Sequence, residues 1–507
     1  MKTSVVQVDG ECPAGQAEEA LRQAGEIIKG GGLVAFPTET VYGLGGDALN
    51  PESARKIYAA KGRPSDNPLI IHICRFEDIR KIVKELPGKA VRTADAFWPG
   101  PLTMILHKAD CVPYETTGGL DTVAVRFPSH PAARKLIEYG GGYIAAPSAN
   151  ASGRPSPTRA GYVTEDMDGK IEMILDGGDV GIGLESTILD LTAEPPRILR
   201  PGYITQEMLE EVLGKVEMDA GLAGDGSGQA PKAPGMKYRH YAPKGNLLVV
   251  EGPPEQVIAY INRQTARDGE TGEKTGVLAT SELLEQYHAD VVQCVGSRGD
   301  EEEIARNLFS ALRAFDDRGV TRIYSESFPD QGLGQAIMNR LLKAAGHHVV
   351  NVRKAGMDAE KEAGSMVAIG SDHGGFALKQ RVIHYLEERK IPYEDLGCYS
   401  EESCDYPVFG HAVAEAVASG KCEQGIVICT TGIGISISAN KVPGIRCALC
   451  GDPLSAKLTR LHNDANMLAL GAGIVGGNLA LEIVETFLNT PFSGEERHRR
   501  RVNLIEK

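Results

Sequence analysis

Apolar runs alternate with polar and glycine-rich turns along this chain, and the alternation restarts twice. In the first stretch, residues 51–60 place Ile57 and Tyr58 on one helical face, which predicts a helix. Four short apolar runs have the length and composition of strands: residues 32–36, 123–127, 143–146 and 188–191. We therefore predict a mixed α/β domain over residues 1–213.

The second stretch, residues 245–352, shows a regular order of strands and helices. The predicted strands are residues 247–251, 276–279 and 322–325. The predicted helices are residues 255–263, 301–315 and 333–345. Strands that alternate with helices favour a layered sheet, so we predict a small Rossmann-like α/β domain.

The third stretch, residues 366–507, begins with a strand at 367–370, a turn at 371–375 and a helix at 376–389. Two further apolar strands follow at residues 425–428 and 447–450. This order is typical of a doubly wound parallel sheet of the Rossmann-like kind. Such sheets bind ligands at the carboxyl ends of their strands.

Two segments between these stretches lack a hydrophobic period. Residues 221–236 are rich in glycine, alanine and proline, and residues 353–365 are polar. Such compositions are typical of linkers. We predict a flexible linker over 214–244 that also closes as a lid, and a second linker at 353–365.

The length of 507 residues is too great for a single core, which agrees with several domains. No apolar run reaches the roughly 18 residues of a membrane span, and residues 1–10 do not resemble a signal peptide. We therefore expect a cytoplasmic protein without a membrane partner. The net charge of −14 argues against broad binding to nucleic acid backbones, although a local basic cluster can hold a small anion.

Ten cysteines in a cytoplasmic chain predict free thiols, not disulfides. Cys447 and Cys450 have the spacing of zinc ligands, but no second such pair follows. Residues three apart on a strand face opposite sides, so we interpret both as core thiols and predict no metal.

The first candidate site combines cations with small polar groups. Lys61 and Arg63 flank a glycine after the predicted helix, which suits a polyphosphate or, alternatively, a solvated helix end. Ser148 and Asn150 follow a predicted strand, where they suit ligand binding or simple turn formation. The same choice applies to residues 185–187.

The second candidate site lies around a glycine-rich turn, residues 429–436, that follows an apolar strand. Its amides could form an anion-binding nest, and Cys429 could be a base or a core thiol. The cationic run 497–501 suits a phosphate monoester or a solvated tail. The pairs at 372–373 and 462–463 are similarly open.

The motifs of the first 352 residues resemble the threonylcarbamoyl-AMP synthase family, also called YrdC-like, in its long form. The matching segments are FPTETVYGLGGDA at 36–48, KGRPSDNPLIIHI at 61–73, DTVAVRFPSHP at 121–131, APSANASGRPSPT at 146–158, LESTILD at 184–190, ILRPG at 198–202 and PGMKYRHYAP at 234–243. The resemblance covers about residues 15–352.

This resemblance implies that threonine and bicarbonate form a carbamate, which attacks the α-phosphate of ATP and releases pyrophosphate. Fixed cations and Mg²⁺ bound with ATP would stabilise the charge on the phosphate. The implied threonine-binding residues are Thr40, His72, Arg126 and Ser186. The implied nucleotide-binding residues are Lys61, Arg63, Asn67, Thr122, Ser148, Asn150, Ser156, Arg200 and Tyr241.

The product, threonylcarbamoyl-adenylate, would then feed other proteins that form N6-threonylcarbamoyladenosine in tRNA. The same fold type also serves as a nucleic-acid-binding module. The acidic net charge disfavours that alternative.

Residues 366–507 resemble the type B ribose-5-phosphate isomerases. The matching segments are IGSDHGGFALK at 369–379, DYPVFG at 405–410, ICTTGIGISISANKVPGIRCALC at 428–450, DPLSAKLTRLHNDANMLALG at 452–471 and ERHRRRV at 496–502. The implied reaction interconverts ribose 5-phosphate and ribulose 5-phosphate without a cofactor. In this family two subunits share each site, which implies a homodimer through this domain.

The resemblance also implies individual roles in isomerisation. Cys429 would move the proton, His462 would open the sugar ring, and Thr431 would help the turn amides to hold the enediolate. The implied sugar-phosphate-binding residues are Asp372, His373, Gly432, Gly434, Asn463, Arg497 and Arg501.

One position departs from the family pattern, because Thr430 stands where a glycine is usual. A β-branched residue is strained where φ is positive, so we expect a strained turn if this position needs such a φ. Two classes of function follow for the whole chain. Either both halves are active enzymes, or one half is a degenerate module for dimerisation or RNA binding. A hexose 6-phosphate, of galactose or allose, is an alternative sugar.

Overall fold

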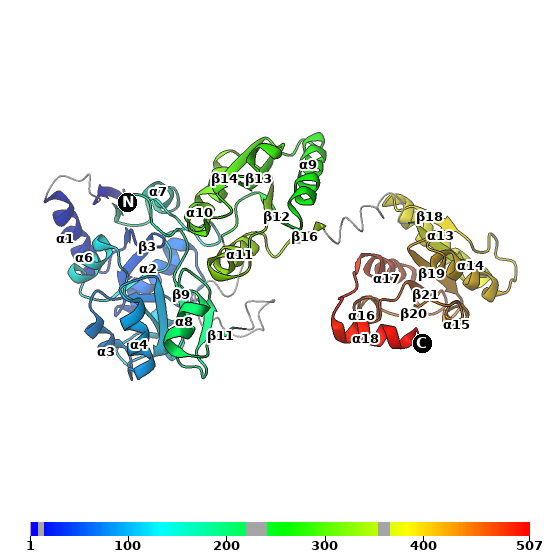
Figure 1. Ribbon diagram of the computed structural model, residues 1–507, viewed down its shortest axis with the longest axis horizontal. Helices are drawn as coiled ribbons and strands as arrows, with labels where there is room; N and C mark the ends of the chain where they lie inside the picture. Colours follow the sequence, from blue (N-terminus) through cyan, green and yellow to red (C-terminus); the bar gives the residue numbers. More distant parts are fainter. Residues whose placement is uncertain (1, 9–14, 220–240, 353–365, 507) are drawn as a thin grey trace. The chain divides into compact units, whose positions relative to one another are not determined.

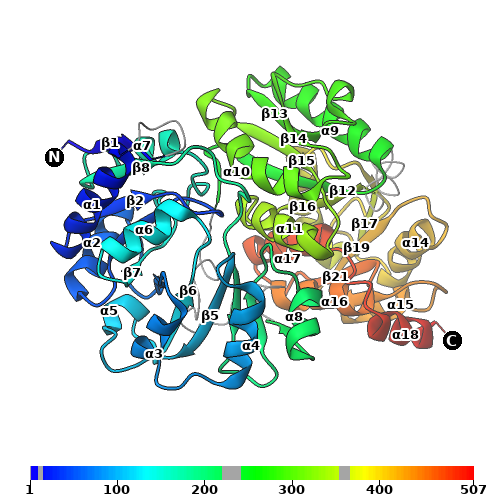
Figure 2. The same ribbon diagram turned by 60° about the vertical axis from the view of Figure 1, so that its left-hand side comes forward.

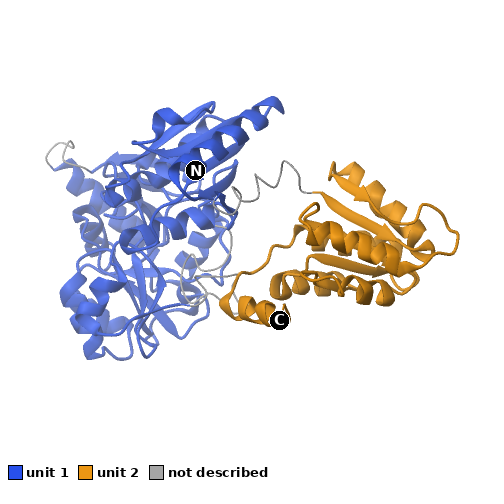
Figure 3. Cartoon of the chain, turned by 45° about the vertical axis from the view of Figure 1, so that its right-hand side comes forward, with its two compact units in different colours: residues 1–353 blue, residues 354–507 orange. Residues whose placement is uncertain are grey.

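The computed structural model describes residues 2–8, 15–219, 241–352 and 366–506. These residues form two compact units, 1–353 and 354–507 (Figure 3). Most of the predicted linker and lid, residues 220–240, and the predicted linker at 353–365 lie outside the described residues. No helix in the described ranges is long and apolar enough to cross a membrane.

The first domain of unit 1 lies at the left of Figure 1. It is built on an eleven-stranded sheet in the order β1-β8-β2-β3-β7-β4-β6-β5-β9-β10-β11. Its strands are β1 Ser4–Gln7, β2 Val34–Phe36, β3 Gly43–Asp47, β4 Ile70–His72, β5 Leu102–His107, β6 Thr122–Arg126, β7 Ile144–Ala145, β8 Met173–Asp176, β9 Thr187–Asp190, β10 Arg197–Arg200 and β11 Glu217–Met218. Its helices are α1 Gln16–Lys29, α2 Pro51–Lys61, α3 Ile79–Ile82, α4 Gly88–Phe97, α5 Tyr114–Thr117, α6 Pro131–Tyr139, α7 Ala160–Met167 and α8 Gln206–Leu213, with a 3₁₀ turn, η1, at Phe76–Asp78. Because β6 pairs in parallel with β4 and antiparallel with β5, the predicted mixed α/β class is confirmed.

Helix α2 shows how local sequence places two candidate residues. Asn50 caps its start by accepting a hydrogen bond from the amide of Glu52. The helix ends at Lys61 because Gly62 adopts a φ of +61°, a left-handed conformation that glycine takes without strain. Arg63 therefore leaves the helix in a new direction, directly beyond its end.

The structure corrects both ends of the linker predicted at 214–244. At its start, β11 pairs in parallel with β10, so residues 217–218 extend the sheet. At its end, Tyr241 is buried. A two-residue strand and a single buried ring carry no hydrophobic period, which is why the sequence pattern did not separate them from a linker.

The second domain of unit 1 has a five-stranded, fully parallel sheet in the order β14-β13-β15-β12-β16. Its strands are β12 Asn246–Glu251, β13 Thr275–Thr280, β14 Val291–Gly296, β15 Arg322–Glu326 and β16 Val349–Asn351. Its helices are α9 Pro254–Glu270, α10 Glu301–Asp317 and α11 Gly332–Ala344, with a 3₁₀ turn, η3, at Leu284–Gln286. Helix α9 covers one face, and α10 and α11 cover the other. The predicted Rossmann-like layering is confirmed.

Helices α10 and α11 lie on the side of this sheet that faces the first domain (Figure 2). Val41 and Leu184 of the first domain belong to the same apolar core as Leu308 and Leu341 of these helices. The two domains therefore share a core and fold as one unit.

Unit 2 is a doubly wound domain with a parallel sheet in the order β18-β17-β19-β21-β20. Its strands are β17 Val367–Ser371, β18 Tyr393–Asp395, β19 Gln424–Cys429, β20 Cys447–Leu449 and β21 Met467–Gly471. Its helices are α13 Phe376–Glu388, α14 Tyr406–Ala418, α15 Ile433–Ala439, α16 Pro453–Asn463, α17 Gly477–Asn489 and α18 Glu496–Ile505, with a 3₁₀ turn, η4, at His373–Gly375. One core holds α13, α16 and α17 against the sheet, and another holds α14 and α15, as the predicted fold requires. The cationic run 497–501 lies on helix α18, and its four arginines are exposed.

Candidate active sites

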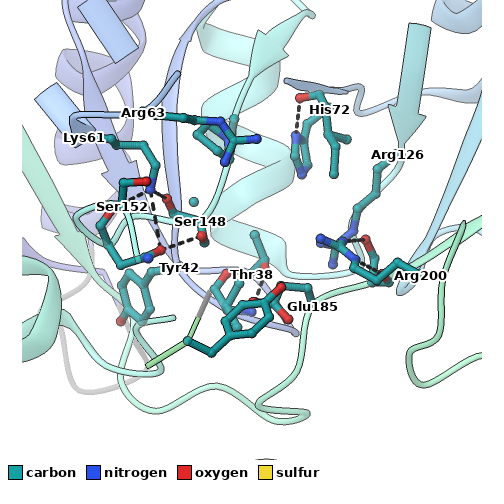
Figure 4. Close-up of a pocket in the computed structure, with 18 of the residues that line it drawn as sticks. Thr38, Tyr42, Lys61, Arg63, His72, Arg126, Ser148, Ser152, Glu185 and Arg200 are labelled. Atoms are coloured by element: carbon teal, nitrogen blue, oxygen red, sulfur yellow. Dashed lines mark hydrogen bonds between the residues drawn. The ribbon is translucent and has the colours of Figure 1, made fainter. Parts of the chain in front are cut away.

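A polar cavity opens in unit 1 where the ends of several strands and helix α2 meet (Figure 4). Lys61 and Ser148 lie on one side of this cavity, and Arg126 and Arg200 lie on the other. The following predicted ligand-binding residues line it: Lys61, Arg63, His72, Arg126, Ser148, Asn150, Ser186, Arg200 and Tyr241. Segments that are far apart in the sequence thus converge on one site.

Lys61 joins helix α2 to the loop that follows β7. Its ammonium group donates hydrogen bonds to the main-chain carbonyls of Ser148 and Asn150. Burial and the nearby charge of Arg63 hold the pKa of Lys61 well below its usual value. Lys61 therefore fixes the loop that carries two predicted nucleotide-binding residues and also faces the cavity.

Arg63 is held by main-chain carbonyls and not by a carboxylate. Its Nε donates to the carbonyl of Asn67 at 3.3 Å, and its Nη2 donates to that of Pro68 at 3.2 Å. Burial lowers the pKa of Arg63 to about 10, which leaves it charged at neutral pH. Among the described contacts no carboxylate forms an ion pair with Arg63, although the charge of Asp66 favours its charged form, and a cation fixed in this way suits an anionic ligand.

On the opposite wall, Arg126 sits at the end of β6. Its Nη2 pairs with Glu39 at 2.6 Å, and its Nη1 donates to the hydroxyl of Thr40 at 2.9 Å. Its buried Nε has no hydrogen-bond partner within the described protein, which leaves a donor available for a ligand. Beside it, burial and the charge of Arg126 lower the pKa of His72 to about 3, so this imidazole is neutral.

Arg200 at the end of β10 positions Ser186, the second of the two predicted threonine-binding residues that carry a hydroxyl. Its Nε donates to the carbonyl of Ser186 at 3.0 Å, and its Nη2 donates to the hydroxyl of the same residue at 3.2 Å. Burial lowers the pKa of Arg200 to about 10. The hydroxyl of Ser186 also lies 2.8 Å from that of Thr103, so its direction is fixed by two neighbours.

Four predicted residues lie outside the cavity lining: Thr40, Asn67, Thr122 and Ser156. Thr40 contacts Arg126, Asn67 anchors Arg63 through its carbonyl, and Ser156 donates a hydrogen bond of 2.5 Å to Glu185. Thr122 begins β6, at the opposite end of that strand from Arg126. Thr40, Asn67 and Ser156 thus contact residues that line the cavity.

Sequence reasoning did not assign roles to several residues that line the cavity, among them Thr38 and Tyr42, and it left Glu185 open between ligand binding and turn formation. The hydroxyl of Thr38 caps its own loop by accepting from the amides of Thr40 and Val41. Their positions within matched motifs were the one available signal, because a threonine or tyrosine after a strand is otherwise an ordinary core or turn residue.

The residues lining this cavity do not by themselves favour a bound metal ion. Glu185 is the one carboxylate among the described residues that line it, and Ser156 and Arg340 already engage its oxygens. No cluster of three metal-ligating side chains occurs in the part of the chain that the structure describes.

The second candidate site lies at the carboxyl end of β19 in unit 2. Strand β19 ends at Cys429, and the amide of Gly432 donates a hydrogen bond of 3.1 Å to its Sγ. Gly432 takes a φ of +74° and precedes α15, while Thr431 is exposed beside it. The thiol therefore faces the start of a glycine-rich turn, as the sequence predicted.

Thr430 does not create the expected strain. The described non-glycine residues with positive φ are Tyr241, His347, Lys390 and Asp464. Within this turn the left-handed conformation falls on Gly432, two residues after Thr430, so the β-branched side chain occupies an ordinary conformation. A Cβ on Gly434 would lie 2.6 Å from the ring of Tyr406, which explains the glycine at that position.

His462 lies in the last turn of α16 and contacts His498 of α18, with 4.5 Å between ring centroids. His498 is buried and its Nδ1 lies 2.7 Å from the hydroxyl of Ser493. Burial holds the pKa of His498 below its usual value. Among the described residues, no hydrogen bond or ring contact joins His462 to Cys429.

The remaining predicted sugar-phosphate-binding residues are divided between two places. Asp372 and His373 lie at the end of β17, where the carboxylate accepts from the amide of Gly375 and Nδ1 of His373 accepts from the amide of Cys404. The others, Asn463, Arg497 and Arg501, lie at the end of α16 and on α18, and all three are exposed.

Family models match three segments of the chain. The model described as Telomere recombination matches residues 26–202, and Threonylcarbamoyl-AMP synthase, C-terminal domain, matches 204–346. The Ribose/Galactose Isomerase model matches 367–505. These ranges follow the order of the three domains.

Individual relatives match either unit 1 or unit 2, and the following two match unit 1. Threonylcarbamoyl-AMP synthase of Pyrococcus abyssi is 51% identical over 335 residues, which are 66% of this chain and 96% of that protein. The solved structure of P. abyssi Sua5 complexed with L-threonine has 50% identity and a TM-score of 0.65, and the match covers 69% of this chain and 99% of that one.

The C-terminal part has its own relatives. The putative sugar phosphate isomerase YwlF of Bacillus subtilis is 51% identical over 140 residues, 27% of this chain and 93% of that protein. Ribose-5-phosphate isomerase B of Escherichia coli is 48% identical over 139 residues, again 27% of this chain and 93% of that protein.

Fold, sites and comparisons together define a fusion of two α/β enzyme domains. Through its first unit the chain belongs to the threonylcarbamoyl-AMP synthase family, and through its second to the ribose/galactose isomerase family of sugar phosphate isomerases.

Proposed function

We propose that unit 1 forms threonylcarbamoyl-AMP from L-threonine, bicarbonate and ATP. The observation that carries the proposal is the cavity of Figure 4, in which buried cations face small hydroxyl groups. In this arrangement the free Nε of Arg126 receives the threonine carboxylate, and the hydroxyl of Ser186, which Arg200 holds, faces the same cavity. Arg63 and Lys61, on the other side, receive the phosphates.

The chemistry follows from these positions. The threonine amine and bicarbonate condense to a carbamate with loss of water. A carbamate oxygen then bonds to the α-phosphorus of ATP, the bond to the bridging oxygen breaks, and pyrophosphate leaves with Mg²⁺. Fixed guanidinium groups in a buried cavity stabilise the negative charge that grows on the phosphate, so positioning and electrostatics supply the catalysis.

The proposed product is a mixed anhydride whose threonylcarbamoyl group other proteins would transfer to adenosine in tRNA, with release of AMP. This role places the protein in the cytoplasm with tRNA-modifying partners. The test is threonine- and bicarbonate-dependent release of pyrophosphate from ATP by the purified chain. Release without threonine would contradict the proposal.

We propose that unit 2 interconverts ribose 5-phosphate and ribulose 5-phosphate. Cys429 removes a proton from the second sugar carbon and returns it to the first, and the turn that begins with Thr431 and Gly432 holds the enediolate. His462 assists ring opening, and Asp372 and Asn463 bind hydroxyls. The supporting observation is the position of the Cys429 thiol at the mouth of its turn.

The phosphate would be held by His373, Arg497 and Arg501. Because these residues lie in two separate places on unit 2, the proposal includes a homodimer that brings them together. Asp372 and His373 lie at one strand end, whereas the arginines project from α18. A second copy of unit 2 that placed its α18 over the first copy's turn would complete the site.

The substrate of unit 2 has two candidate classes, a pentose phosphate and a hexose phosphate. One relative of unit 2 is named a ribose-5-phosphate isomerase and another a putative sugar phosphate isomerase, so a hexose 6-phosphate is the alternative substrate. Initial rates with ribose 5-phosphate, allose 6-phosphate and galactose 6-phosphate decide between them. The proposal requires the highest kcat/KM for ribose 5-phosphate.

A further inference from the structure

Arg340 belongs to helix α11 of the second domain, yet its guanidinium group ends in the first domain. It is fully buried, with 0% of its side chain exposed. Its Nε donates to Oε2 of Glu185 at 3.0 Å, and its Nη1 donates to the carbonyl of Pro201 at 2.6 Å. Its Nη2 donates to the carbonyl of Glu185 at 3.3 Å. One side chain thus binds both the main chain and the carboxylate of the same residue.

Glu185 is the carboxylate that faces the proposed ATP cavity. It lines the cavity among four cationic residues, and its other oxygen, Oε1, accepts the hydroxyl of Ser156. Burial would raise the pKa of Glu185, but the charges of Arg340 and Arg200 and the hydrogen bond from Ser156 hold it below its usual value. Glu185 is therefore ionised within a cavity that must accept a polyanion.

A second buried arginine of the same domain has a similar arrangement. Arg313 of α10 donates through Nε and Nη2 to the carbonyl of Pro155 at 3.1 and 2.6 Å, and through Nη2 to Asp166 at 2.8 Å. The loop before Pro155 carries Ser152 and Gly153, which line the cavity. Two arginines of the second domain therefore brace two walls of the site.

We propose that Arg340 is a positioning residue of the synthase site, through which the second domain neutralises Glu185 and holds it away from the phosphates of ATP. The inference rests on the proposed synthase function. Without Arg340, an ionised Glu185 would be left without its nearest countercharge and would repel the incoming phosphates. Affinity for ATP should then fall more than affinity for threonine, whose site lies toward Arg126.

The test compares Arg340→Met with the double variant Arg340→Met/Glu185→Gln, and uses exposed Arg318→Met on the same domain as a control. We expect the KM for ATP to rise about tenfold or more in Arg340→Met, with a smaller change in the KM for threonine. The Glu185→Gln replacement in the Arg340→Met background should restore much of the ATP affinity, because it removes the uncompensated charge.

A purely structural role for Arg340 predicts a different pattern, with lower thermal stability, an unchanged KM for ATP and no rescue by Glu185→Gln. That pattern would overturn the inference. If Arg340→Met fails to fold, Arg340→Lys keeps the charge but loses the forked geometry, and it should show an intermediate KM for ATP. An ATP-binding titration of the same variants tests the role of Arg340 separately from the synthase function. A wild-type chain that binds ATP without making pyrophosphate would refute the synthase function while still testing Arg340.

Discussion

The amide of Gly432 donates a hydrogen bond of 3.1 Å to Sγ of Cys429, across the turn that joins β19 to α15. A main-chain donor aimed at this sulfur fixes the thiol against the start of the turn. The left-handed conformation of Gly432 makes this approach possible, and a Cβ there would lie 2.8 Å from the main chain of Leu470.

Replacement of Cys429 by serine is expected to lower the isomerase kcat by about 10²-fold or more, because a serine hydroxyl ionises far less readily than a thiol at neutral pH. Cys447→Ser is the matched control. It is also a buried thiol on a strand of unit 2, and burial raises its pKa to about 12. Near-wild-type isomerisation by Cys429→Ser would show that the base lies elsewhere.

Arg63→Ala tests the phosphate side of the synthase cavity. Arg63 makes its two hydrogen bonds to carbonyls, so its removal breaks no ion pair with a carboxylate in the described contacts. Loss of one charge-assisted phosphate contact should lower pyrophosphate release by about 10²-fold. Arg92→Ala, an exposed position on α4, is the control and should match the parent. Unchanged release in Arg63→Ala would place the phosphates elsewhere.

His72 predicts a pH dependence of stability. Its pKa of about 3 in the folded state lies below the value near 6.5 that an unfolded chain shows. Between these values the unfolded chain binds a proton that the folded chain does not. The free energy of unfolding should therefore fall as the pH drops from 6.5, by at most about 1.4 kcal/mol per pH unit for this residue.

The measurement is denaturant unfolding of unit 1 at several pH values, followed through Trp98, the single tryptophan of the chain. His72→Gln should reduce the slope of stability against pH below 6.5, whereas the exposed His107→Gln should not. Equal slopes in His72→Gln and the parent would show that His72 does not resist protonation in the fold.

The division into two units predicts that they separate without loss of chemistry. A protease site placed within 353–365 should release two soluble pieces, each of which keeps its own activity. A protease cleavage site placed within 220–240 should give a different result. The two domains of unit 1 should stay together after cleavage there, because they share a core and the Arg340–Glu185 pair. Loss of either activity after the first cut would show that the units depend on each other.

The hydrophobic pattern was sufficient to predict the three domains, because in each of them strands alternate along the chain with amphipathic helices of ordinary length. It could not reveal β11, a strand of two residues that is too short to show a hydrophobic period and that pairs in parallel with β10. It also missed the positions of Arg313 and Arg340, because a charged residue on an amphipathic helix normally lies in solvent. Only the packing of the second domain on the first buries them.

The candidate sites were predictable as far as motifs follow strand ends. The pattern alone left Lys61, Ser148 and Asn150 open between ligand binding and a helix end or turn, and the family resemblance grouped them in one nucleotide site. The sequence could not show that Lys61 donates hydrogen bonds to the main chain of Ser148 and Asn150. Nor could it show that Gly432, and not Thr430, takes the positive φ. The first depends on the packing of helix α2 against the loop after β7, and the second on the backbone of the turn after β19.

The central claim is that one chain carries two independent active sites. Its most direct test measures both activities on the same preparations of wild type, Arg63→Ala and Cys429→Ser. We predict that wild type releases pyrophosphate with threonine, bicarbonate and ATP and also isomerises ribose 5-phosphate. Arg63→Ala should lose only the first activity, and Cys429→Ser only the second. A wild-type chain with one activity alone, or a variant that loses both while it remains folded, would contradict the account.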